Sequence, residues 1–240
     1  MSTLPSSFLF RMKLQARRFD AAAARPEPLD AAYRLPFVER YPLPSPKTPS
    51  PKGKGASKEE PAFDFRLGWS EKGLRLTAIL TGKRGRVRCT PSELETSDAL
   101  SFFIDTRDVR DSHRASGFCH RFMFLPTDRT KGEGGQPLVL WLPIRRFRAM
   151  PRSVDTTLIK TSAQIRPGGW TLSAFLPAEV LTGYDPSQES RLGVWYSLFD
   201  HELGHFTLQH SPAFPADEDP SLWPVLELID ELPKNPSGEK

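Results

Sequence analysis

The chain has 240 residues, of which 38% are hydrophobic, 10% aromatic and 26% charged, a composition typical of one large folded domain and not of a fibrous or disordered protein. Its 33 basic and 29 acidic residues are interspersed and leave a net charge of +4, which does not favour a nucleic-acid-binding protein. No apolar run is long enough to span a membrane, and residues 1–20 lack the apolar core of a secretion signal.

Only two cysteines are present, Cys89 and Cys119. This number excludes a disulfide framework and a four-cysteine zinc site, although one bridge between the two thiols stays open. We therefore expect a protein of the reducing cytoplasm that has no membrane partner.

The first 60 residues divide into two parts. Residues 1–40 form an N-terminal segment, in which an apolar stretch at 33–38 can add an edge strand to the following domain. Residues 41–60 are rich in Pro, Lys and Gly, which predicts a flexible loop or linker, because proline favours extended polyproline geometry and removes backbone donors. Such a segment can also dock on a protein partner with an aromatic groove, and a protein-interaction or scaffold module is one alternative function.

Residues 61–230 show the two-residue alternation of β-strands. Two hairpins are predicted, 63–69 with 74–80 and 158–165 with 170–176, the second through a Pro-Gly-Gly turn. Residues 177–181 can form a single helical turn. Further strands are predicted at 99–105, 119–125, 138–142, 191–199, 206–210 and 222–228. The pattern predicts an all-β protein, an antiparallel β-sandwich with few short helical turns, followed by a disordered tail at 231–240.

Residues 201–205 read His-Glu-Leu-Gly-His and match the H-E-x-x-H pattern of zinc proteases. In those enzymes a helix places the two histidines on one face to bind zinc. The flanking residues here alternate and are aromatic or β-branched, which is typical of strands. We therefore expect a hairpin in which Asp200 bonds back to the backbone and Gly204 adopts a positive φ. A zinc-dependent hydrolase with His201 and His205 as metal ligands is the alternative.

Carboxylates, imidazoles and a thiol accumulate between residues 105 and 120. Carboxylates at alternating positions can bind calcium, whereas His and Cys suit zinc. The donor types are mixed without a standard spacing, so we favour an Asp/Arg ion-pair network that fixes a long loop, with a calcium or zinc site as the alternative. Cys119 and His120 cannot form a nucleophile–base pair, because neighbours in a strand point to opposite faces.

Three segments follow one another in a characteristic order. A strand bounded by aspartates covers 98–105, a tryptophan-led segment covers 170–181, and a late strand ending in an acidic turn covers 194–200. This order, over residues 63–228, resembles the family 9 carbohydrate-binding modules and the related DOMON-like sandwiches. Residues 113–120 depart from the general pattern and suggest a specialised bacterial subgroup.

The resemblance implies a non-catalytic binding module for a carbohydrate or similar polar ligand, with a role in carbohydrate catabolism. Sugar-binding members of the family hold the sugar between aromatic faces, with polar groups reaching its hydroxyls. Trp141 and Trp223 are candidates for such a platform, with core packing as the competing role for any strand tryptophan. The residues that we expect at the ligand site are Trp69, Asp105, Arg107, Asp108, His113, Arg114, His120 and Trp195.

Overall fold

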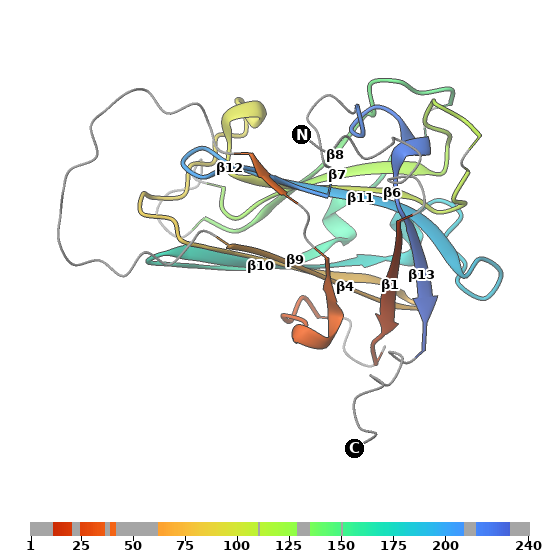
Figure 1. Cartoon of the computed structure of the whole chain (residues 1–240), viewed down its shortest axis with the longest axis horizontal. Helices are drawn as coiled ribbons and strands as arrows, with labels where there is room; N and C mark the ends of the chain where they lie inside the picture. The colour runs from red at the N-terminus through yellow and green to blue at the C-terminus, as the bar shows by residue number, and fades with distance from the viewer. Residues whose placement is uncertain are drawn as a thin grey trace, which may run out of the picture.

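The computed structural model describes residues 12–20, 25–36, 39–41, 62–109, 111–128, 135–149, 151–208 and 215–230. Within these ranges, 13 strands form one continuous, mostly antiparallel sheet that folds over into two layers (Figure 1). The described residues contain short 3-10 turns and no α-helix, and none of their helical turns could cross a membrane. The prediction of an all-β fold is confirmed.

The first layer is built from two hairpins. The β4–β5 hairpin turns at Gly73, whose φ of +138° is a conformation that favours glycine. The β9–β10 hairpin turns through Gly168 and Gly169, as predicted. The strands are β4 (Ala62–Ser70), β5 (Gly73–Thr81), β10 (Gly169–Pro177) and β9 (Lys160–Arg166), with the short β2 (Arg34–Leu35) paired to β4.

The second layer is centred on the long strand β11 (Arg191–Asp200). One side of β11 pairs with β6 along residues 193–199, and the other side pairs with β13 at its start and β12 at its end. The remaining strands of this layer are β6 (Ala99–Asp105), β7 (Cys119–Leu125), β8 (Leu138–Leu142), β12 (Gly204–Thr207) and β3 (Glu39–Tyr41).

Strands β1 (Lys13–Arg18) and β13 (Val225–Ile229) join the two layers at one side of the molecule (Figure 1). β13 pairs with β11 of the second layer, and β1 pairs in parallel with both β13 and β4. Leu14 and Ala16 of β1 are buried between the layers. The N-terminal segment therefore contributes an interior strand in addition to the edge strand β2.

Aromatic side chains fill the space between the layers. Phe65 of the first layer stacks on Tyr196 of the second, with ring centroids 4.1 Å apart, and lies 6.1 Å from Phe102. Cys89 and Cys119 are both buried and do not form a disulfide with each other. Burial raises the pKa of Cys119 to about 11, so this thiol is not an activated nucleophile.

Three strand starts differ from the predicted ones by two residues or more. β9 begins at Lys160 instead of residue 158, because the 3-10 turn η4 (Thr156–Leu158) precedes it. β12 begins at Gly204 instead of residue 206, because the turn is only three residues long. β13 begins at Val225 instead of residue 222, because the 3-10 turn η6 (Pro220–Leu222), capped by the Asp219 carboxylate, precedes it. Tyr41, the first residue of the predicted linker at 41–60, belongs instead to strand β3 and pairs with β12. Residues 42–60, with the proposed partner-docking segment, and the predicted tail at 231–240 lie outside the described residues.

Candidate ligand-binding site

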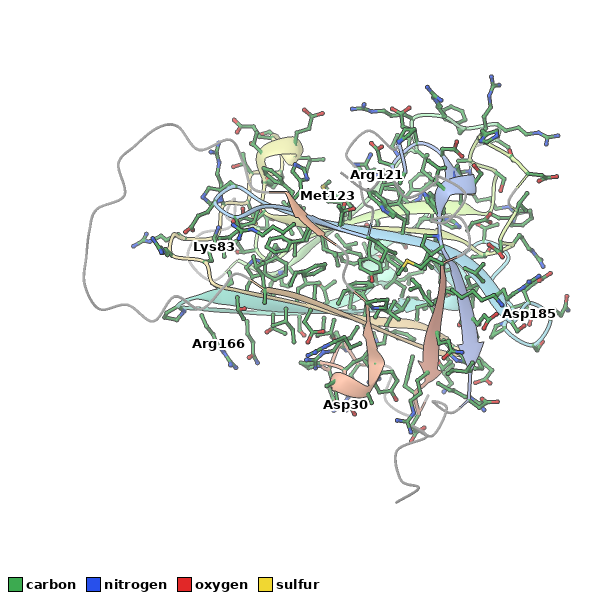
Figure 2. The ribbon with its side chains drawn as sticks, viewed as in Figure 1. Asp30, Lys83, Arg121, Met123, Arg166 and Asp185 are labelled. Carbon is green, nitrogen blue, oxygen red and sulfur yellow. The ribbon has the colours of Figure 1, made fainter. Side chains whose placement is uncertain are left out.

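The outer face of the second layer carries three rows of side chains that run across neighbouring strands. Residues that lie directly opposite each other on paired strands point to the same face, so the strand register defines each row. From β8 toward β12, the first row is Leu142, Arg121, Phe103 and Trp195, the second is Met123, Ser101, Ser197 and Thr207, and the third is Ala99, Phe199 and His205. Figure 2 shows Arg121 and Met123 on this layer.

These rows form the floor of a pocket of about 560 Å³, a volume typical of small-molecule sites. The serines of the middle row have small side chains and leave the centre of the floor open. Phe103 and Trp195 lie at one end with ring centroids 4.9 Å apart, and Phe199 and His205 lie at the other with centroids 4.7 Å apart. The pocket therefore offers aromatic surface at both ends.

Three polar atoms of the pocket residues are buried without a hydrogen-bond partner among the described residues. They are Arg121 Nε, Trp195 Nε1 and Thr207 Oγ1. A buried polar group without a partner costs about 1–3 kcal/mol. A polar ligand that reached these atoms would remove that cost, since two of them are donors and the hydroxyl can donate or accept.

Charged side chains of both signs line one side of the pocket. Arg121 lies over the Phe103 ring, with its guanidinium carbon 5.3 Å from the ring centroid. Burial lowers the pKa of Arg121, and the nearby carboxylates of Asp217 and Glu95 offset this only in part. Arg145 is more exposed and forms an ion pair of 3.6 Å with Glu218. Guanidinium and carboxylate groups on one wall can together donate to and accept from neighbouring hydroxyls of one ligand.

The stretch that matches the zinc-protease pattern forms the turn between β11 and β12. Asp200 Oδ1 accepts hydrogen bonds from the backbone N–H groups of Glu202, at 2.9 Å, and Leu203, at 2.8 Å. Gly204 has a φ of +94°. The predicted hairpin and the predicted roles of Asp200 and Gly204 are confirmed. The helical face that the protease motif requires is therefore missing from this described turn.

The two histidines of this stretch lie in different surroundings. His201 Nδ1 is 2.7 Å from Asp98 Oδ1, and these two residues cluster with Asp200. His205 is on the outer face of β12, where its ring contacts Phe199. The structure thus joins His201 to a carboxylate cluster that does not include His205.

Of the eight predicted ligand-site residues, Trp195 lines the pocket. The other seven do not line it; they are Trp69, Asp105, Arg107, Asp108, His113, Arg114 and His120. Trp69 is on the first layer, where its Nε1–H donates to the Ile229 carbonyl at 3.1 Å. Its indole therefore helps to attach β13 to β4.

The predicted polar cluster after β6 forms a structured loop. The carboxylate of Asp105 accepts hydrogen bonds from the backbone N–H groups of Arg107, at 3.0 Å, and Val109, at 2.8 Å. Arg107 pairs outside the loop with Glu189 at 3.3 Å. Asp108 adopts a φ of +47°, in the left-handed region. Asp105 thus fixes the start of the loop by accepting backbone hydrogen bonds.

The remaining predicted residues, His113, Arg114 and His120, have different surroundings. His113 Nδ1 is 2.9 Å from Asp219 Oδ2 and 3.0 Å from Ser221 Oγ. Because both partners meet the same ring nitrogen, these residues do not have the arrangement of a Ser-His-Asp triad. Arg114 is exposed. His120 is fully buried, and its Nε2 accepts a hydrogen bond from the Thr182 N–H at 3.0 Å.

Sequence reasoning missed most of the pocket, including Phe103, Arg121 and Phe199. The signal that could have found them is the alternation in the predicted strands, in which every second residue shares one face. That signal is incomplete, because β6 and β11 are about 90 residues apart and the sequence does not state their register.

Comparisons with known proteins show what this fold resembles. No family model matches the sequence, and no curated protein matches it. Among solved structures, a family 9 carbohydrate-binding module from Caldicellulosiruptor kristjanssonii, in complex with cellotriose, superposes with a TM-score of 0.61 at 12% identity, over 94% of this chain and 100% of that chain. The same module in complex with glucose matches equally well.

A protein from Bacteroides uniformis with a proposed carbohydrate-binding role also has this fold. It matches with a TM-score of 0.51 at 13% identity, over 90% of this chain and 99% of that chain. At these identities the comparisons establish the fold alone. The chain therefore has the fold of the family 9 carbohydrate-binding modules, as the order of its sequence motifs indicated.

Proposed function

We propose that this protein is a non-catalytic module that binds a carbohydrate in the pocket on the outer face of β6, β7, β11 and β12. The observation that carries the proposal is the combination of aromatic rings with unpartnered buried polar atoms in one pocket. A pyranose has an apolar face that packs on aromatic rings and a rim of hydroxyls that needs hydrogen bonds. The likeness to modules solved with cellotriose and glucose supports the same ligand class.

The length of the pocket favours more than one sugar ring. Trp195 and Phe199 both line it and lie four residues apart on β11. At about 3.4 Å per residue, their Cα atoms are separated by roughly 14 Å. One ring over the Trp195 end and a second near Phe199 would use both aromatic groups.

Isothermal titration with glucose and cellotriose tests this proposal. We expect Phe199→Ala to weaken binding by about tenfold or more, because it removes an aromatic contact surface. Phe118→Ala is the matched control, since Phe118 is an exposed phenylalanine, 37% accessible, that does not line the pocket. Absence of binding for glucose, cellotriose and other mono- and oligosaccharides would overturn the proposal. Equal losses of affinity in Phe199→Ala and Phe118→Ala would show that the sugar does not bind in this pocket.

A finer variant tests the polar half of the site. Trp195→Phe keeps an aromatic ring and removes Nε1–H, which has no protein partner in the described structure. Because a neutral hydrogen bond contributes about 1 kcal/mol, we expect affinity to fall by roughly fivefold with little change in protein stability. Titration and thermal unfolding measure the two effects separately; an unchanged affinity would show that Trp195 Nε1 does not contact the sugar.

A further inference from the structure

Lys83 carries a buried ammonium group at the end of the molecule where β11 leads into β12 (Figure 2). Its side chain is only 1% exposed. Nζ lies 2.7 Å from Asp200 Oδ2 and 3.1 Å from Asp98 Oδ2, and both aspartates are fully buried. One cation thus lies between two carboxylates that have no contact with solvent.

Two more side chains lie near the same ammonium. His201 Nδ1 is 3.4 Å from Lys83 Nζ, and Glu202 Oε2 is 3.9 Å away. His201 Nδ1 also lies 2.7 Å from Asp98 Oδ1, to which it donates, so the groups that can face a cation here are the three carboxylates. Carboxylate oxygens are the ligands that suit divalent ions such as Mg²⁺, Ca²⁺ and Mn²⁺.

Backbone N–H groups hold the carboxylates in place independently of Lys83. Asp98 accepts from the N–H groups of Arg88 at 2.9 Å and His201 at 2.8 Å, and Asp200 Oδ1 accepts from two N–H groups of its own turn. The Glu202 carboxylate accepts from the N–H of Gly85 at 2.7 Å. The ligands would therefore keep their positions if the lysine side chain were shortened.

We infer that Lys83 is the resident cation of a latent metal site. Its ammonium occupies the position that a divalent ion would take, and such an ion binds there once the lysine side chain is replaced by a shorter one. The physical reason is that two buried carboxylates need a compensating positive charge, because an uncompensated buried charge costs several kcal/mol. We call Lys83, Asp98, Asp200, His201 and Glu202 the lysine cage.

The lysine cage also borders the proposed ligand pocket. Asp98 lies between Ser97 and Ala99, and Asp200 directly follows Phe199; these three neighbours all line the pocket. Lys83 is thus a positioning residue for one end of the pocket, a part of the inference that rests on the proposed function. The metal-site part does not depend on it.

The test compares Lys83→Ser with wild type, using Mn²⁺ as the probe. We expect the variant's Tm to fall by roughly 10 °C without metal, since breaking a buried ion pair is strongly destabilising. Mn²⁺ should restore at least half of this loss in Tm, and its free-ion electron paramagnetic resonance signal should disappear on binding. Wild type should show neither effect. Lys160→Ser, which removes an exposed lysine of β9, is the matched control and should behave like wild type.

Each other result is decisive. A variant that stays unfolded in Mn²⁺, or folds without binding the ion, would overturn the latent site, and so would wild-type protein that binds Mn²⁺ in the cage. Adding Asp200→Asn to Lys83→Ser should abolish the rescue.

For the pocket, glucose and cellotriose affinity should fall in Lys83→Ser and recover with Mn²⁺. An unchanged affinity would end the positioning role alone, and wild type that binds no sugar would end the proposed function while leaving the metal result readable.

Discussion

Lys83 and His120 are both buried nitrogen bases, but their neighbours differ. Lys83 lies among carboxylates, which stabilise a positive charge. His120 stacks on Phe122 and accepts a hydrogen bond from the Thr182 N–H, so its surroundings favour the neutral ring. Burial accordingly lowers the pKa of His120 to about 4. At the scale of single residues, the contacts and not the residue type set the electrostatic role.

His120 predicts a loss of stability in acid. Between its ordinary pKa of 6.5 and the folded value of about 4, the unfolded chain binds a proton that the folded protein does not. The contribution is therefore complete above pH 6.5 and is lost as the pH falls toward 4, by up to about 3 kcal/mol. His120→Gln removes the titrating group and should flatten this dependence.

Urea unfolding near neutral pH and near pH 4.5 measures the effect. We expect the free energy of unfolding of wild type to drop by about 2 kcal/mol more than that of His120→Gln, because other groups titrate equally in both proteins. Equal drops in the two proteins would contradict the buried neutral state of His120.

At the scale of elements, turn geometry fixes the hairpins that carry both layers. The β9–β10 turn uses two adjacent glycines with different constraints. Gly169 has a φ of +158°, and a Cβ added to it would lie 1.8 Å from the Leu80 carbonyl oxygen of the neighbouring strand β5. Gly168 has a φ of +93°, and a Cβ there would meet nothing within 4 Å.

The two glycines therefore predict different costs of substitution. Gly168→Ala carries the conformational penalty alone, about 1–2 kcal/mol. Gly169→Ala adds a collision with the backbone that must move β10 away from β5. We therefore expect the free energy of unfolding to fall by more than about 3 kcal/mol. Chemical denaturation of both variants gives the comparison, and a Gly169→Ala protein as stable as Gly168→Ala would show that β10 is free to shift.

At the scale of the whole molecule, β1 closes the seam between the layers. It is the strand between β13 and β4, and it pairs with both in parallel. A strand from the start of the chain thereby holds the last described strand against the first layer. Contacts of such long sequence separation cost loop-closure entropy, which the packing of buried side chains in the seam must offset.

Substitution of Leu14 tests how strongly the packing of β1 contributes to the stability of the protein. Its side chain is 2% exposed, whereas the neighbouring Gln15 points outward and is exposed. Leu14→Ala should lower the free energy of unfolding by about 2–5 kcal/mol, and Gln15→Ala by less than about 0.5 kcal/mol. Thermal unfolding of the full chain provides the measurement. Similar losses for both variants would mean that β1 is not a packed interior strand.

Local chemistry in the sequence determined the main strands of residues 61–230, both predicted hairpins and the turn at the zinc-protease-like stretch, but not the strands β1 and β3. Alternation identified β4 and β5, a continuous apolar run identified β6, and the Pro-Gly-Gly turn identified the β9–β10 hairpin. Asp200 and Gly204 identified the turn, because their requirements are local hydrogen bonds and a positive φ. The order of motifs led to the family 9 fold, which the solved structures confirm.

Tertiary structure alone decided which residues share a site. Trp195 was in the predicted set, but Arg121, Phe103 and Phe199 join it only through the register of β7, β6 and β11. Lys83 gave no sequence signal either, because its partners lie 15 and 117 residues away and meet it only when the layers close. Pairing between distant strands depends on the packing of the entire core, and this is why the sequence specified the strands while the fold specified the pocket and the lysine cage.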